Sequence, residues 1–101
     1  MTKGLKLITV TPSDRREKKY KAVFEKKNGK TLTRHFGQKN SSTYLDHKDK
    51  SRRARYIQRH SNEIQFYNDP TRPATLSRYI LWGNSTKLSE ALKKFKQKFN
   101  V

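Results

Sequence analysis

The first third of the chain alternates apolar and polar residues with the two-residue period of β-strands. Residues 5–11 are rich in β-branched side chains and end at Pro12, and two further alternating runs flank Asn28-Gly29. This pattern predicts strands at about 5–11, 19–26 and 30–36, with the last two joined as a hairpin.

The length of the hairpin loop follows from the side chains that it places opposite each other. A two-residue loop would pair Phe24 with Thr33, an apolar residue against a polar one. A three-residue loop at 27–29 pairs Phe24 with Leu32 and puts Gly29 at the left-handed position of a type I turn with a G1 bulge. We therefore expect the three-residue loop. It collects five side chains on one apolar face: Tyr20, Ala22, Phe24, Leu32 and Phe36.

Beyond residue 43 the apolar residues recur with a helical period. They predict three helices, at about 46–60, 72–82 and 86–99. A loop at 37–43 precedes the first helix, and a proline-containing connection at 61–73 precedes the second. The third has a clear amphipathic stripe, formed by Leu88, Ala91, Leu92, Phe95 and Phe99.

Polar residues and glycine mark where these helices begin and end. Asp46 and Asp49 are both plausible N-caps of the first helix, and Thr71 is a candidate cap of the second, which Gly83 would end. The whole pattern predicts one α+β domain over residues 1–101. We expect an antiparallel hairpin or three-stranded sheet, followed by three helices packed on its apolar face.

The charge of the chain points to a polyanionic partner. There are 25 Lys and Arg against 8 Asp and Glu, a formal net charge of +17. Most of the bases therefore need counter-charge from another molecule, and nucleic acid is the commonest polyanion. An acidic protein surface and an anionic membrane are the alternatives. The apolar stripe of the third helix is needed for the core, so we expect no membrane partner.

The first predicted helix carries the strongest candidate binding surface. At 100° per residue, Arg52, Arg55, Tyr56 and Arg59 form one stripe, with Ile57 on the far side. The planar fork of arginine suits phosphate, and an adjacent tyrosine suits stacking. A solvated helix face is the alternative interpretation. The predicted nucleic-acid-binding residues are Arg52, Arg53, Arg55, Tyr56, Arg59, Lys48 and Arg78.

Two further features allow more than one interpretation. Trp82 lies off the apolar stripe of its helix; we expect it to be buried, and a stacking platform or an interface anchor is the alternative. Asp46, His47 and Asp49, with another histidine, could form the metal site of a small nuclease. Both aspartates are equally explained as helix caps, and no known ligand spacing is present. We therefore expect no enzyme, no catalytic residues, no metal and no cofactor. The chain has no cysteine.

The chain resembles a family of short basic proteins encoded by nucleocytoplasmic large DNA viruses of algae and amoebae, over roughly residues 18–99. The likeness rests on these runs: His35-Phe36-Gly37, His47-Lys48-Asp49, Arg52-Arg53-Ala54-Arg55-Tyr56, Arg59-His60, Leu76-Ser77-Arg78, Leu81-Trp82-Gly83 and Ser85-Thr86. The resemblance implies a viral setting: the virion, and in the host cell the cytoplasmic virus factory or the nucleus.

These observations together predict a non-enzymatic nucleic-acid-binding protein that is largely indifferent to sequence. In the implied viral setting DNA is favoured over RNA, and the protein would be a virion or genome-associated component. A minor capsid or cement protein that contacts acidic capsid protein is the alternative, and a metal-dependent nuclease is the third hypothesis.

Overall fold

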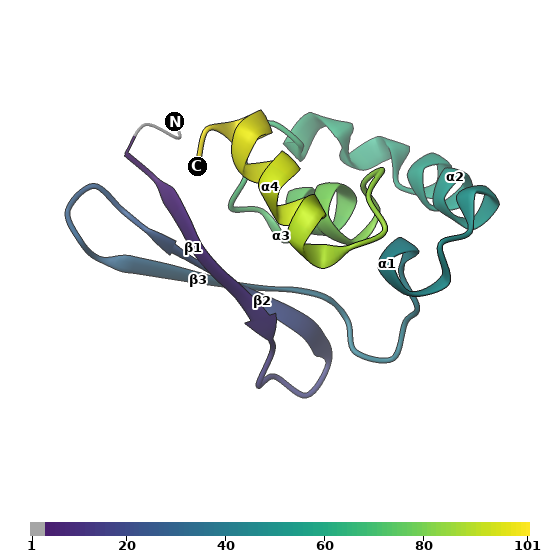
Figure 1. The fold of residues 1–101 in the computed structure, drawn as a ribbon, viewed down its shortest axis with the longest axis horizontal. Helices are drawn as coiled ribbons and strands as arrows, with labels where there is room; N and C mark the ends of the chain where they lie inside the picture. The colour runs from purple at the N-terminus through teal and green to yellow at the C-terminus, as the bar shows by residue number, and fades with distance from the viewer. Residues whose placement is uncertain (1–3) are drawn as a thin grey trace.

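The computed structural model describes residues 4–101 and has the expected α+β fold, with a three-stranded antiparallel sheet followed by helices (Figure 1). The strands are β1 (Lys6–Pro12), β2 (Lys18–Glu25) and β3 (Thr31–Gln38), in the order β1-β2-β3. The helical elements are α1 (Tyr44–His47), α2 (Lys50–Arg59), a 3₁₀-helix (Ser61–Phe66), α3 (Pro73–Leu76), a π-helical turn (Ser77–Leu81) that continues α3, and α4 (Leu88–Phe99).

The β2–β3 hairpin has the predicted register and loop. Phe24 lies opposite Leu32, and the Gly29 N–H donates to the carbonyl of Lys26 over 2.9 Å. Gly29 has a φ of 84°, in the left-handed region that the G1 bulge requires. The predicted three-residue loop is therefore confirmed. β3 extends two residues beyond its predicted end at residue 36. Gly37, which was predicted to begin a loop, still belongs to the strand.

Strand β1 carries a bulge that the alternation in its sequence did not predict. Leu7 pairs with Phe24 and Thr9 pairs with Val23, which leaves Ile8 as an extra residue. The extra residue shifts the alternation, so that Leu7 and Val10 both lie on the apolar side of the sheet while Ile8 is 49% exposed.

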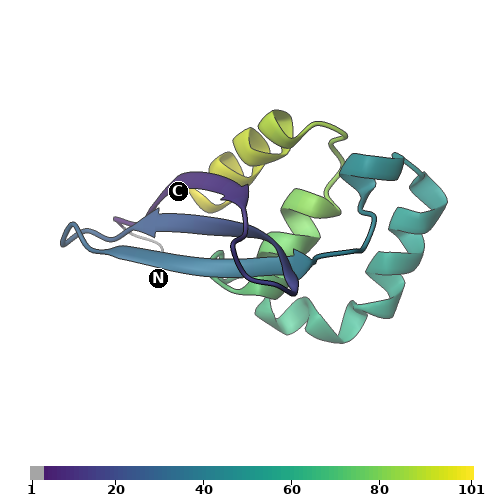
Figure 2. The same ribbon diagram turned by 90° about the horizontal axis from the view of Figure 1, so that it is seen from below.

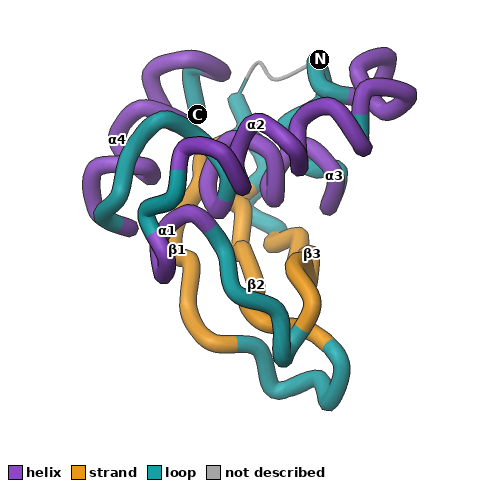
Figure 3. The backbone as a smooth tube through the Cα atoms, turned by 90° about the vertical axis from the view of Figure 1, so that its right-hand side faces the viewer, coloured by secondary structure: helices purple, strands orange, loops and turns teal. Residues whose placement is uncertain are grey.

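The core lies between one face of the sheet and the second half of the chain. Phe24 and Phe36 are fully buried against Leu76, Ile80 and Phe95. α3 and the π-helical turn contact β3, and α4 packs on the π-helical turn. Figure 3 shows these helices on one side of the strands. The predicted stripe of α4 is confirmed, since its central residues Ala91 and Phe95 are 1% exposed.

The first predicted helix differs from the prediction in two ways. It is divided into α1 and α2, because Lys48 adopts a left-handed conformation, with φ 57°, and ends α1. It also does not cover the sheet: α2 contacts mainly α1 and the 3₁₀-helix, and it buries no residue. Figure 2 shows α2 beyond the end of the sheet where β3 finishes.

The connection before α3 is more ordered than the sequence indicated. It includes the 3₁₀-helix, and the N-cap of α3 is Arg72 rather than Thr71. The Thr71 hydroxyl instead donates to Asp69 Oδ1 over 2.7 Å. Gly83 follows the π-helical turn as predicted, for a steric reason: a Cβ there would lie 2.5 Å from the carbonyl oxygen of Tyr79. No helix within residues 4–101 is long and apolar enough to span a membrane.

Candidate functional site

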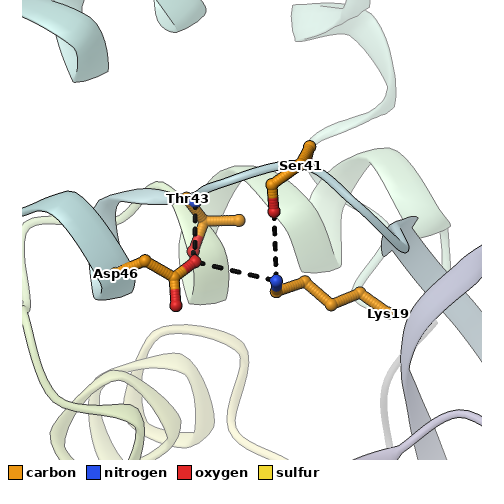
Figure 4. A network of polar contacts seen from close by, with 4 residues as sticks. All are labelled: Lys19, Ser41, Thr43 and Asp46. Carbon is orange, nitrogen blue, oxygen red and sulfur yellow. Dashed lines mark hydrogen bonds and ion pairs between the residues drawn. The ribbon is translucent and has the colours of Figure 1, made fainter.

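The loop before α1 is fixed by a small polar network (Figure 4). Asp46 Oδ2 accepts hydrogen bonds from the backbone N–H and the hydroxyl of Thr43, over 2.8 and 3.0 Å. Lys19 of β2 lies 3.7 Å from the same oxygen and also donates to the carbonyl of Ser41 over 3.0 Å. The Thr43 backbone N–H is the main reason that the pKa of Asp46 lies below its ordinary value. The network holds residues 41–46 against the sheet.

Asp49 starts α2. Its Oδ1 accepts from the backbone N–H groups of Ser51 and Arg52, over 2.9 and 3.3 Å. These bonds, that of Arg52 first, lower the pKa of Asp49. His47 Nδ1 in turn accepts from the Asp49 backbone N–H over 2.9 Å. Asp46, His47 and Asp49 thus each serve local structure. Among residues 4–101 no three His, Asp or Glu side chains gather in a way that could hold a metal ion.

The arginine stripe of α2 forms one wall of a cleft of about 810 Å³. Arg52, Arg55 and Arg59 line the cleft from α2, and they share one side of the helix as its periodicity predicted. The other walls come from the end of β3, the loop before α1 and the π-helical turn. They supply Gly37, Gln38, Ser41, Ser42, Thr43, Ser77 and Leu81.

Stacked aromatic rings hold α2 in position beside the cleft. The Tyr56 ring is parallel to Trp82, with centroids 4.3 Å apart, and stacks on His60 with centroids 4.0 Å apart. A ring has two faces, so both faces of Tyr56 are covered. Burial raises the pKa of the Tyr56 hydroxyl to about 12. Its place beside the arginines had suggested that Tyr56 stacks on a base. That interpretation is wrong, because Tyr56 packs between two protein rings.

Trp82 is buried, as predicted, and packs against α2 and α1 rather than serving as an exposed platform. His47 lies beside it, with ring centroids 5.3 Å apart. Because His47 Nδ1 accepts a hydrogen bond, Nε2 carries the proton of the neutral ring. His47 Nε2 is buried and has no hydrogen-bond partner among the described residues. The cleft lining therefore includes an unused N–H donor.

The remaining predicted binding residues lie outside the cleft lining. Arg53 Nε donates to the carbonyls of Trp82 and Gly83, over 3.2 and 2.8 Å, and so attaches α2 to the segment after the π-helical turn. Arg78 Nη1 donates to the Trp82 carbonyl over 3.1 Å. Lys48 is exposed at the left-handed junction between α1 and α2. Four of the seven predicted residues, Arg52, Arg55, Tyr56 and Arg59, thus line one cleft.

The cleft is rich in donors and has no negative charge of its own. No Asp or Glu belongs to its lining, and none of the ion pairs within residues 4–101 involves Arg52, Arg55 or Arg59. The hydroxyl and amide groups of the opposite wall were not predicted to belong to the site. From the sequence, residues 37–43 were predicted only as a polar loop. No local pattern of residues indicated that this loop would face α2.

The fold and the cleft define a small basic α+β protein with an arginine-lined cleft. The chain belongs to DUF5754, a family of unknown function whose model matches residues 8–60. The match covers the sheet apart from Lys6 and Leu7, the loop before α1 and the arginine stripe. No curated protein and no solved structure matches the chain.

Proposed function

We propose that the protein is a non-enzymatic nucleic-acid-binding protein that holds the phosphate backbone in the arginine-lined cleft. The observation that carries the proposal is the convergence of Arg52, Arg55 and Arg59 on one concave surface without a carboxylate partner. Guanidinium groups bind phosphate with two donors each, and phosphate contacts supply most of the affinity in sequence-independent binding.

The aromatic residues of the cleft support backbone binding over base recognition. Sequence-tolerant binding of single strands usually combines basic residues with exposed rings on which bases stack. Here both faces of Tyr56 are covered by protein rings, and Trp82 is buried. The opposite wall offers Gln38, Ser41 and Ser42, which can donate hydrogen bonds to phosphate oxygens.

The biological setting is also part of the proposal. The resemblance to basic proteins of large DNA viruses supports a virion or genome-associated role, with DNA as the favoured partner. A capsid or cement role, in which the arginines meet acidic capsid protein, remains the alternative hypothesis. The two hypotheses differ in a measurable property, because binding to nucleic acid releases condensed counterions.

The test is a salt titration of binding. The full chain would be titrated by fluorescence anisotropy into labelled duplex DNA, single-stranded DNA and RNA of unrelated sequences at several salt concentrations. Each phosphate that the protein neutralises contributes about -0.9 to the log–log slope on duplex DNA, so three arginine contacts give about -2.7. Similar affinities across sequences are expected. Absent binding, or a flat salt response, would contradict the proposal.

A further inference from the structure

A second, smaller basic pocket lies between the segment after the π-helical turn and α4. Its volume is about 330 Å³. Four cationic side chains line it, from three different elements: Arg53, Arg78, Lys94 and Lys98. No Asp or Glu belongs to its lining. It shares no lining residue with the arginine-lined cleft, so it is a separate site.

The charges of this pocket are held together but only partly neutralised. Arg53 and Arg78 donate to the same Trp82 carbonyl, which fixes their positions and carries no net charge to offset theirs. Burial, followed by the nearby Arg78, lowers the pKa of Arg53. Lys94 has one anionic neighbour, Glu90, at 3.7 Å. The pocket thus concentrates positive charge, which favours an anion.

Ser85 gives a second, independent sign of a ligand. The residue is only 3% exposed, and its Oγ is buried without a hydrogen-bond partner among the described residues. Buried hydroxyl groups are almost always hydrogen-bonded, so an unused one in a pocket lining indicates a missing partner. Ser85 lines the pocket together with Asn84, whose side-chain oxygen accepts from Lys94 over 3.2 Å.

We propose that this pocket binds a phosphate group, with the cations supplying charge and the Ser85 hydroxyl donating a hydrogen bond. A phosphate carries more charge and more acceptor oxygens than a carboxylate, and so matches donors that approach from several elements. The phosphate could belong to a free polyphosphate or to a nucleic-acid backbone. The site does not depend on the arginine-lined cleft and would bind phosphate even if that cleft did not.

The test uses two probes on the full chain, sodium tripolyphosphate and a short single-stranded oligonucleotide. The readout is the backbone amide NMR signals of residues 83–85 in ¹⁵N-labelled protein. Tripolyphosphate should shift these signals with saturation. Shifts at the same amides with the oligonucleotide identify a nucleic-acid phosphate as a ligand, and shifts with tripolyphosphate alone identify a free polyphosphate. Absence of saturable shifts with both probes would overturn the proposal.

Two variants separate a built site from general charge attraction. Lys94→Gln with Lys98→Gln removes two charges from the pocket. Lys93→Gln with Lys96→Gln removes two charges from the same helix outside it. The first double variant should lose about tenfold or more in affinity for tripolyphosphate, and the second should lose much less. Equal losses would show diffuse attraction and overturn the proposal.

The Ser85→Ala variant tests whether Ser85 binds a ligand or serves only the fold. Without phosphate, the unfolding midpoint should stay the same or rise, because an unsatisfied buried hydroxyl is removed. With tripolyphosphate, the affinity should fall about tenfold, since a hydrogen bond to a charged group is lost. A lower midpoint in the free protein with unchanged affinity would show that Ser85 serves the fold and not a ligand.

Discussion

Helices α2 and α4 are both strongly basic, but they are held in place in different ways. α4 buries Ala91 and Phe95 in the core, and its lysines cover the outer face of an amphipathic helix. α2 buries no residue, and its attachment depends on the stacking of Tyr56 on Trp82 and on the hydrogen bonds of Arg53. The outward-facing lysines of α4 keep a core helix soluble, and Lys94 and Lys98 also line the second pocket. Arg52, Arg55 and Arg59 of α2 have no comparable structural role, in contrast to Arg53.

This difference indicates where function is to be sought. Ordering α2 costs conformational entropy, and the helix contributes little to the core in return. It presents Arg52, Arg55 and Arg59 to a cleft rather than to open solvent. The hydrophobic effect therefore accounts for the position of α4. The position of α2 is fixed by a few polar and aromatic contacts, which orient Arg52, Arg55 and Arg59 toward a common space.

The largest effect that separates the two helices should be on stability. Phe95→Ala removes a fully buried ring and should lower the free energy of unfolding by about 3–5 kcal/mol. Ile57→Ala on α2 should cost about 1 kcal/mol, because that side chain is only half-buried. Urea unfolding followed by circular dichroism measures both. Equal costs would show that α2 belongs to the core after all.

The attachment of α2 should also depend on pH. Tyr56 ionises near its ordinary pKa of about 10 in the unfolded chain and near about 12 in the folded chain. Above pH 10 the folded state keeps a proton that the unfolded state has lost, so stability falls as the pH rises from about 10 to about 12. Tyr56→Phe should reduce this fall. Burial also raises the pKa of Tyr67, so part of the fall in stability should remain in this variant. Trp82, the single tryptophan, reports unfolding by fluorescence.

The smallest expected effect concerns the acidic residues at the starts of α1 and α2. Asp46 and Asp49 are engaged in capping, so supercoiled plasmid incubated with the protein and Mg²⁺ or Mn²⁺ should remain intact. Gel electrophoresis checks this outcome. Nicking that disappears in Asp49→Ala, with the circular dichroism spectrum unchanged, would instead support the nuclease hypothesis.

The sequence predicted those parts of the fold that depend on local periodicity. The pairing of Phe24 with Leu32 followed from alternation and from the conformational freedom of Gly29. The stripe of α4 followed in the same way from helical spacing. The division between α1 and α2 could not be predicted, because Lys48 has no residue-type preference for the left-handed region. The bulge at Ile8 could not be predicted either, because it depends on which side chains of β1 pack into the core.

The candidate site was predicted only in part. The angular positions of Arg52, Arg55 and Arg59 follow from the helix alone, and all three line the cleft. The roles of Tyr56 and Arg53 depend on Trp82 and Gly83, which lie far along the chain and are brought close only by the tertiary fold. For the same reason the sequence did not indicate which loop would form the opposite wall of the cleft.

The central claim is that the arginines of α2 bind phosphate as a site and not merely as positive charge. The direct test compares two triple variants with equal loss of charge. The first variant carries Arg52→Ala, Arg55→Ala and Arg59→Ala. The second carries Lys26→Ala, Lys27→Ala and Lys30→Ala at the exposed tip of the β2–β3 hairpin. This tip lies at the far end of the molecule from α2 (Figure 1).

The measurement is the salt dependence of duplex DNA binding for both variants, with folding checked by circular dichroism. Loss of the arginines should weaken binding across all sequences and reduce the magnitude of the log–log slope by about 2.7. The hairpin-tip variant should keep most of the affinity and the slope. Unchanged affinity and slope in the arginine variant, or equal losses in the two variants, would contradict this account.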